Sequence, residues 1–234
     1  MWKGASFVAL VFLATPAFSQ PVPRQGAQLV PPAGVCRTAI LIAEQAAKIP
    51  AQLLAAMARV ESGRFDPVSN RVNPWPWTIN AEGRSMVFDT KRQAIAAVEA
   101  LQAQGMRSID VGCVQVNLMH HPQAFVSLDQ AFDPLANARY AAQFLTQLRE
   151  KTGDWLLATA HYHSATPEFG NTYQSKVTAA WPEEQRIALS SRVIGIAADS
   201  GQIIAPSLSQ SGSRLPSLAR PARLLPTQTT RLPR

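Results

Sequence analysis

A glutamate closes an apolar helical pattern in the stretch AAMARVESGRF, residues 55–65. Leu54, Met57 and Glu61 are spaced i, i+3, i+7, so the carboxyl group lies on the face that a core should bury. Apolar neighbours and the negative end of the helix dipole both disfavour a charged carboxylate, and both therefore raise its pKa. A carboxyl group that keeps its proton near neutral pH can act as a general acid. The plainer alternative is a glutamate that ends the apolar face and reaches solvent.

The helix that carries Glu61 has recognisable ends. Pro50 suits a first helical turn and Gly63 a helix stop, so the pattern predicts one helix of about a dozen residues that ends at Ser62. Glu61 would then stand in its last turn.

Other elements must build the rest of the site. Thr90 and Gln93 have the spacing of a capping box, and Gly105 suits a stop, so a helix is expected between them. Further predicted elements are helices at 36–50, 127–133, 134–151 and 155–164, and a short hairpin that pairs 77–80 with 84–88. The sequence thus predicts a mainly α domain with one β-hairpin insert.

Composition divides the chain into four segments. Residues 1–19 contain an early lysine, an apolar run too short to span a bilayer and a small-x-small cleavage site, so we expect a secretory signal peptide and no transmembrane segment. Residues 20–34 are Pro-rich and resemble a flexible leader. Residues 35–185 are long enough for one folded domain, and residues 186–234, rich in Pro, Ser and Arg, predict a disordered tail.

The formal net charge of +7 is concentrated at the ends of the chain. Lys3 and five arginines beyond residue 200 account for six of these charges, which leaves +1 for residues 20–200. A basic tail can contact nucleic acid, anionic lipid or an acidic wall polymer, and export makes nucleic acid the least suitable of these.

The chain contains two cysteines, Cys36 and Cys113. In an exported protein this count favours one disulfide, with a buried free pair as the alternative.

Four motifs together carry a family resemblance. VESG at 60–63, GCVQVNL at 112–118, AHYHS at 160–164 and NTYQSKV at 171–177 follow the order of the motifs of the lytic transglycosylases with an SLT domain. These are lysozyme-like enzymes that cleave the glycan strands of bacterial peptidoglycan. The resemblance covers residues 36–182, and the additional WPWTIN stretch is similar to a proteobacterial branch of the family.

The resemblance implies roles for five residues. Glu61 matches the family's catalytic acid/base, and Ser62 the polar residue beside it. Gln115 matches the glutamine that lines the sugar groove, Tyr162 the tyrosine that hydrogen-bonds near the glutamate, and Tyr173 the tyrosine of the last motif. The sequence departs from the family at Val114, where Met is usual, and at His163, where Asn is usual.

The implied reaction breaks the bond between N-acetylmuramic acid (MurNAc) and N-acetylglucosamine (GlcNAc). One glutamate acts as acid and then as base, and the muramyl 6-hydroxyl closes a 1,6-anhydro ring. Asp66, Asp89 and Asp110 could supply a second carboxylate, but each is expected to serve a turn or a cap.

Two further groups of residues have types that could bind sugar or metal. Trp75 and Trp77 could stack on sugar rings or pack the hairpin onto the domain, and both alternatives stay open. The histidine pairs 120–121 and 161/163 lack the H-E-x-x-H spacing of zinc sites, so no metal and no cofactor is expected.

We therefore expect a monomeric enzyme of the periplasm that acts on peptidoglycan glycan strands. A secretion or flagellar assembly is a possible partner, because some members of the similar branch accompany such machinery. Nucleic acid is not an expected partner. The alternatives are a muramidase, which would hydrolyse the same bond, and a non-catalytic wall-binding or secretion-scaffold module.

Overall fold

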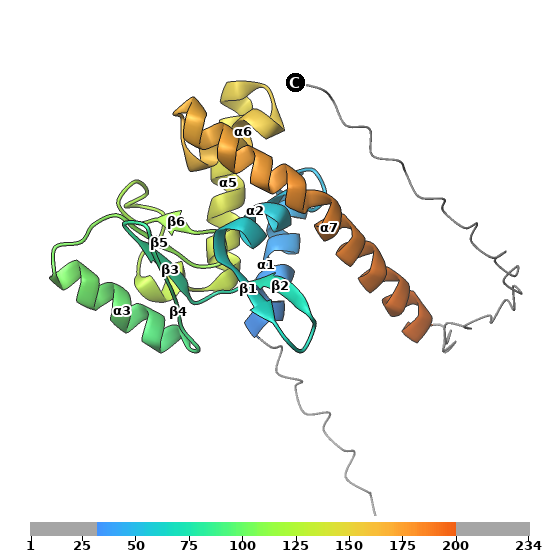
Figure 1. Cartoon of the computed structure of the whole chain (residues 1–234), viewed down its shortest axis with the longest axis horizontal. Helices are drawn as coiled ribbons and strands as arrows, with labels where there is room; N and C mark the ends of the chain where they lie inside the picture. Colours follow the sequence, from blue (N-terminus) through green and yellow to red (C-terminus); the bar gives the residue numbers. More distant parts are fainter. Residues whose placement is uncertain (1–31, 200–234) are drawn as a thin grey trace, which may run out of the picture. The chain divides into compact units, whose positions relative to one another are not determined.

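The computed structural model describes residues 32–199 (Figure 1). Their elements, in chain order, are α1 (Pro32–Ala46), α2 (Leu53–Ser62), β1 (Gly63–Asp66), β2 (Arg71–Pro74), β3 (Thr78–Ala81), β4 (Arg84–Val87), α3 (Lys91–Ala103), β5 (Ile109–Val111), β6 (Val116–Asn117), α4 (Leu128–Ala131), α5 (Pro134–Thr152), α6 (Trp155–His163) and α7 (Pro167–Asp199). The chain divides into two units, 1–190 and 191–234, and the described part of the second is the end of α7.

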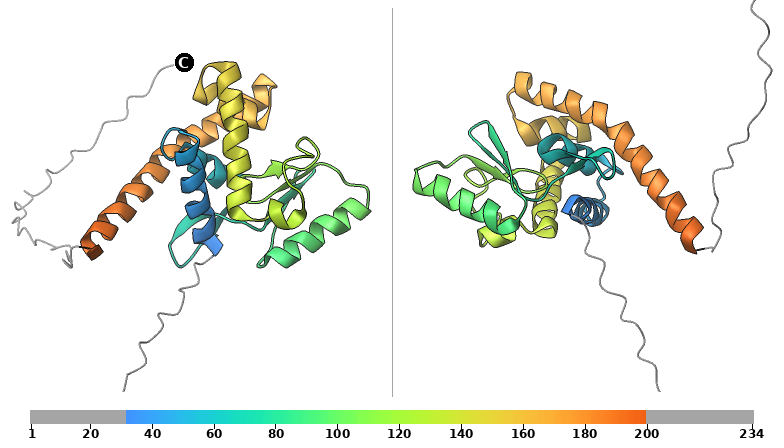
Figure 2. Two further views of the ribbon diagram at one scale, coloured as in Figure 1. Left: turned by 180° about the vertical axis from the view of Figure 1, so that it is seen from behind. Right: turned by 60° about the horizontal axis from the view of Figure 1, so that its bottom comes forward.

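Helices form the larger of two hydrophobic clusters. The long helix α5 packs against both α1 and α6 (Figure 2). The first half of α7 adds two buried side chains, Tyr173 and Val177. In α2, every residue from Leu53 to Ala58 is buried, as the apolar pattern predicted. The last turn of α2 is thereby fixed on a rigid support.

A small antiparallel sheet forms the second cluster. Its strand order is β4-β3-β5-β6, and α3 packs against it through Ala94 and Val98. Ile79, Ile109 and Val111 supply the strand side of this cluster. Because strand residues alternate between faces, the neighbours of these apolar residues face away from α3.

The predicted helix ends are confirmed where a cap defines them. Thr90 and Gln93 form the complete capping box that begins α3. Asp133 and Asp154 each accept a hydrogen bond from a first-turn amide, in α5 and α6 respectively. The mainly α, lysozyme-like fold class is also confirmed.

The sequence predicted one hairpin, but the described residues contain more strands than that. The hairpin of β3 and β4 is present, but β1 pairs with β2 as a second hairpin, and β5 and β6 extend the larger sheet. These extra strands have two to four residues each. Such short strands show almost no alternation in sequence, and their pairing depends on neighbours that only the fold supplies.

Two predicted helix starts also shift. Helix α1 begins at Pro32, inside the expected leader, and α2 begins at Leu53 and not at Pro50. The Glu44 carboxylate accepts hydrogen bonds from the amides of Gln52 and Leu54, so a contact from another helix sets the start of α2.

The expected disordered tail is wrong between residues 186 and 199, where α7 continues as a helix and Ile187 is buried. The expected signal peptide, residues 1–19, and residues 200–234 lie outside the described residues. None of the helices found in residues 32–199 is both long enough and apolar enough to cross a membrane.

Candidate active site

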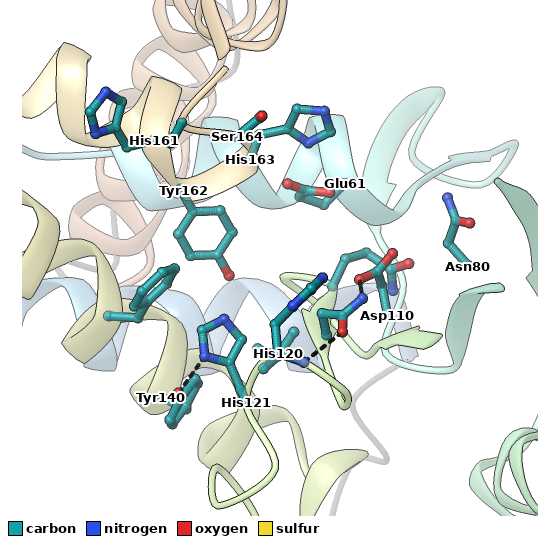
Figure 3. Close-up of a pocket in the computed structure, with 15 residues that line it drawn as sticks. Glu61, Asn80, Asp110, His120, His121, Tyr140, His161, Tyr162, His163 and Ser164 are labelled. Atoms are coloured by element: carbon teal, nitrogen blue, oxygen red, sulfur yellow. Dashed lines mark hydrogen bonds between the residues drawn. The ribbon is translucent and has the colours of Figure 1, made fainter. Parts of the chain in front are cut away.

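A pocket of about 470 Å³ opens beside the end of α2 (Figure 3). Its walls come from α2, the larger sheet, α5, α6 and the segments between them. The lining residues are Glu61, Asn80, Asp110, Gln115, Val116, Asn117, His120, His121, Tyr140, Phe144, His161, Tyr162, His163, Ser164 and Ala165. Three of the residues predicted from sequence, Glu61, Gln115 and Tyr162, are therefore brought together in one cavity.

Glu61 is half-buried and borders this pocket. Burial raises the pKa of its carboxyl group to about 8, and the negative charge of Asp110 raises it further, whereas the Tyr173 hydroxyl opposes the rise. The side chain is therefore largely shielded from solvent, yet it stays partly exposed and lines the pocket. Glu61 is consequently protonated at neutral pH and accessible to a ligand.

Tyr173 lies next to Glu61, outside the pocket lining, and is almost completely buried. Its hydroxyl is near enough to lower the Glu61 pKa but does not reach full hydrogen-bond geometry, and among the described residues it has no other partner. His163 stacks on the Tyr173 ring at 4.8 Å between centroids. The His163 that replaces the family's usual Asn therefore covers Tyr173 and lines the pocket.

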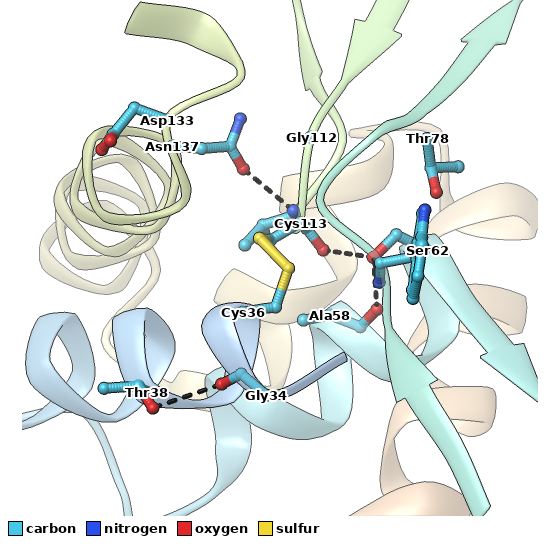
Figure 4. Close-up of a disulfide and its surroundings, with 12 residues drawn as sticks. Gly34, Cys36, Thr38, Ala58, Ser62, Thr78, Gly112, Cys113, Asp133 and Asn137 are labelled. Carbon is cyan, nitrogen blue, oxygen red and sulfur yellow. Dashed lines mark hydrogen bonds between the residues drawn. A yellow bond between two sulfur atoms is a disulfide. The ribbon is translucent and has the colours of Figure 1, made fainter. Parts of the chain in front are cut away.

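Residues 111–116, which carry Gln115, are held from several sides (Figure 4). The Cys36–Cys113 disulfide ties this segment to α1, which confirms the predicted pair. Ser62 is buried, and its hydroxyl donates to the Cys113 carbonyl at 2.7 Å and accepts from the Trp75 amide at 3.2 Å. Ser62 thus supports the segment behind the pocket and does not line the pocket itself.

A glycine and an asparagine shape the turn within this segment. Gly112 has φ +85°, and a Cβ at this position would collide with the Asn137 side chain. Asn137 is fully buried; its amide donates to the carbonyls of Val111 and Ala131 and accepts from the Val114 amide. The close approach of Asn137 therefore requires glycine at 112.

Gln115 adopts φ +47°, a conformation that is uncommon for a residue with a side chain. Its Nε2 atom donates to the carbonyls of Thr78 and Gly112 at 3.0 and 2.9 Å. These two bonds occupy the amide nitrogen, so in the part of the chain that the structure covers Gln115 Oε1 is the atom left for a ligand. Backbone strain of this kind concentrates at functional sites.

Tyr162 lines the pocket but does not hydrogen-bond Glu61. Its hydroxyl donates to the Val114 carbonyl at 2.9 Å. Burial raises its pKa well above the ordinary value, and the nearby negative charges of Glu61 and Asp110 add to the rise. Tyr162 is therefore a neutral wall of the pocket that also holds the strained turn.

The two tryptophans lie outside the pocket lining. Trp75 donates from Nε1 to the Phe88 carbonyl at 2.7 Å, and the Arg64 guanidinium lies over its ring. Trp77 packs edge-on against Trp75 and contacts the sheet cluster. Their observed contacts are those of packing residues.

Asp110 is the pocket residue whose placement the sequence prediction missed. Asp66 does serve a turn, through bonds from the Val68 amide and the Ser69 hydroxyl, and Asp89 is exposed beside Arg64. Asp110 instead lines the pocket. The signal was available in the alternation of Ile109, Asp110 and Val111, because two buried apolar neighbours on one face place the aspartate on the other.

The pocket lining includes four histidines, His120, His121, His161 and His163. His121 accepts or donates at Nδ1 with the Tyr140 hydroxyl at 2.8 Å and contacts the Phe144 ring edge-on. Within residues 32–199, no group of three or more His, Cys, Asp or Glu side chains is placed to hold a metal ion.

Comparison with known proteins gives one match. The model of the family described as "Transglycosylase SLT domain" matches residues 38–180, which include every pocket residue. No curated protein and no solved structure matched the chain.

Proposed function

Because the chain belongs to the transglycosylase SLT domain family, an enzyme family that degrades peptidoglycan, we propose that it is an exported lytic transglycosylase with Glu61 as its single acid and base. It cleaves the bond between MurNAc and GlcNAc and leaves 1,6-anhydro-MurNAc ends. The observation that carries the proposal is a carboxyl group with a pKa of about 8 that opens onto a pocket.

One residue, Glu61, can both donate and take back the proton that the reaction needs. Protonated Glu61 donates to the bridging glycosidic oxygen, and the bond from that oxygen to the muramyl anomeric carbon breaks. The muramyl 6-hydroxyl then attacks the anomeric carbon and returns a proton to the Glu61 carboxylate. Gln115 Oε1, which has no partner among residues 32–199, is available to accept a hydrogen bond from the bound glycan.

Export is supported by two features of the chain. Residues 1–19 have the pattern of a secretory signal peptide. The disulfide between Cys36 and Cys113 suits an oxidising compartment such as the periplasm. Work beside a secretion or flagellar assembly is part of the proposal and rests on the sequence resemblance.

Mass spectrometry of purified sacculi digested with the mature chain tests the proposal. The expected products are 1,6-anhydromuropeptides without a reducing end. Glu61→Gln keeps the shape of the side chain and removes its acid, so its activity should fall to background, a loss of at least about 100-fold. Undiminished cleavage by Glu61→Gln would refute the assignment.

A muramidase is the second candidate, because Asp110 places another carboxyl group in the pocket. Hydrolysis would give reducing muramic acid, so the same mass spectra separate the two activities.

A further inference from the structure

Asp110 occupies a distinct position in the pocket. It belongs to β5, the strand between β3 and β6, and its side chain faces the cavity that Glu61 borders (Figure 3). Its neighbours along the strand, Ile109 and Val111, are both fully buried in the cluster that includes α3. The pleat of a strand anchored in the second hydrophobic cluster therefore aims Asp110 at the catalytic pocket.

Asn117 fixes the orientation of this carboxylate. Its Nδ2 atom donates to Asp110 Oδ1 at 2.8 Å and to the Ser108 hydroxyl at 3.1 Å. Its Oδ1 atom accepts from the amides of Met119 and His120, both at 3.0 Å. Asn117 thus uses both ends of its side chain, whereas Asp110 Oδ2 accepts no hydrogen bond from residues 32–199.

The surrounding groups act differently on the pKa values of the two carboxyl groups, Glu61 and Asp110. Burial raises the pKa of Asp110, but the Asn117 hydrogen bond and the nearby His163 and His120 oppose the rise. The groups that act on Glu61 are Asp110 from β5, Tyr162 from α6 and Tyr173 from α7. His163 of α6 lines the same pocket, and burial lowers the pKa of its imidazole. Burial raises the pKa of both carboxyl groups, but for Asp110 the Asn117 amide and two nearby histidines act against it, an asymmetry that suits an acid beside an electrostatic partner.

We propose that Asp110 is a second catalytic residue of this site, which stabilises the positive charge that develops on the cleaved sugar, and that Asn117 is its positioning residue. This inference rests on the proposed function. Asp110 forms no bond to the substrate and exchanges no proton. As Glu61 protonates the leaving oxygen, the electron pair of the broken bond stays on that oxygen, and the charge left at the anomeric carbon is attracted by the Asp110 carboxylate until the 6-hydroxyl attacks.

The test compares Asp110→Asn with Asp89→Asn in the full mature chain. Both remove one carboxylate without changing the volume, but Asp89 is exposed and outside the pocket. With a soluble glycan tetrasaccharide from peptidoglycan as substrate, Asp110→Asn should lower kcat about 100-fold and leave KM within roughly threefold. Asp89→Asn should leave both constants near those of the wild type.

The pH profile adds a readout that a structural role would not move. The Asp110 charge raises the Glu61 pKa, so Asp110→Asn should shift the alkaline limb of kcat/KM to lower pH. Asn117→Ser removes the bond that lowers the Asp110 pKa, so it should shift the acid limb to higher pH. Asp110→Glu, which keeps the charge, should be more active than Asp110→Asn.

The outcomes separate this inference from the proposed function. An inactive Glu61→Gln together with an Asp110→Asn variant as active as Asp89→Asn would overturn the role of Asp110 alone. An active Glu61→Gln would overturn the proposed function. If Asp110→Asn fails to fold, the acid limb of Asn117→Ser decides, and an unmoved limb contradicts the inference.

Discussion

Glu61 lowers the stability of the fold that holds it. The residue sits at the end of a helix whose first six positions are buried, and burial is the main cause of its raised pKa. An unfolded chain would leave the same carboxyl group in water, where it ionises freely. The charged form therefore favours the unfolded state, which is the usual consequence of tuning a group for acid chemistry.

This tuning predicts a pH-dependent gain in stability for Glu61→Gln. Between the ordinary pKa of 4.5 and the folded value of about 8, the folded wild type binds more protons than the unfolded chain. Its stability consequently falls as pH rises through this window, whereas glutamine cannot ionise. In urea unfolding, the advantage of Glu61→Gln over wild type should grow by roughly 1 to 4 kcal/mol between pH 4.5 and pH 9.

Glu99→Gln is the matched control, because Glu99 is an exposed residue of α3. Its effect on the free energy of unfolding should change little over the same pH range. A constant difference between Glu61→Gln and wild type would contradict the burial of the Glu61 carboxyl.

At the scale of elements, the turn from Gly112 to Gln115 decides the shape of the pocket. It is held by the disulfide at Cys113, by the Asn137 side chain and by the Tyr162 hydroxyl. Each constraint comes from a different helix. The strained backbone of Gln115 is therefore maintained by the helices around it.

Gly112→Ala should test this support. Two changes act together, since alanine disfavours a φ of +85° and its Cβ would displace Asn137 from three hydrogen bonds. We expect a loss of about 3 to 5 kcal/mol in the free energy of unfolding, with reduced cleavage of sacculi.

Gly153→Ala separates the two causes. Gly153 has φ +75°, but a Cβ there would meet no atom within 4 Å. Its substitution should cost only about 1 to 2 kcal/mol and leave activity intact. Equal losses for both variants would show that Asn137 tolerates the added methyl group.

At the scale of the whole molecule, Glu184 joins helices that lie far apart in the sequence. This fully buried carboxylate of α7 pairs with Arg37 of α1 and Arg59 of α2, and Arg37 also donates to Asn73 of β2. The beginning and the later part of the domain are thus coupled through one charge cluster. Removal of one partner from such a cluster leaves an uncompensated buried charge.

Two truncations should therefore behave differently. A chain that ends at Asp199 keeps Glu184 and Ile187 and should cleave a small soluble glycan like the full protein. It also lacks the five arginines beyond residue 200, so its binding to whole sacculi should weaken at low salt and approach that of the full chain at high salt.

A chain that ends at Gln185 loses the buried Ile187 and the helix that follows. Its unfolding free energy should fall by about 2 kcal/mol or more. Thermal unfolding of the two truncated chains checks this, and equal midpoints would contradict it.

The sequence by itself determined the features that depend on local order. The apolar stripe that ends at Glu61, the capping box of Thr90 and Gln93 and the pair Cys36–Cys113 were all predictable. Each is written in residue types at short spacing, or in a count of two cysteines. Such signals can be recognised in the sequence without knowledge of the fold.

Only the tertiary structure decided which polar residues share the pocket. Asp110 and Asp66 look alike in sequence, yet one faces Glu61 and the other closes a turn. Ser62 stands beside the candidate acid but points into the support behind it. The physical reason is that alternation in a short strand shows which side chains share a face, whereas pairing and packing with distant segments decide which face meets the pocket.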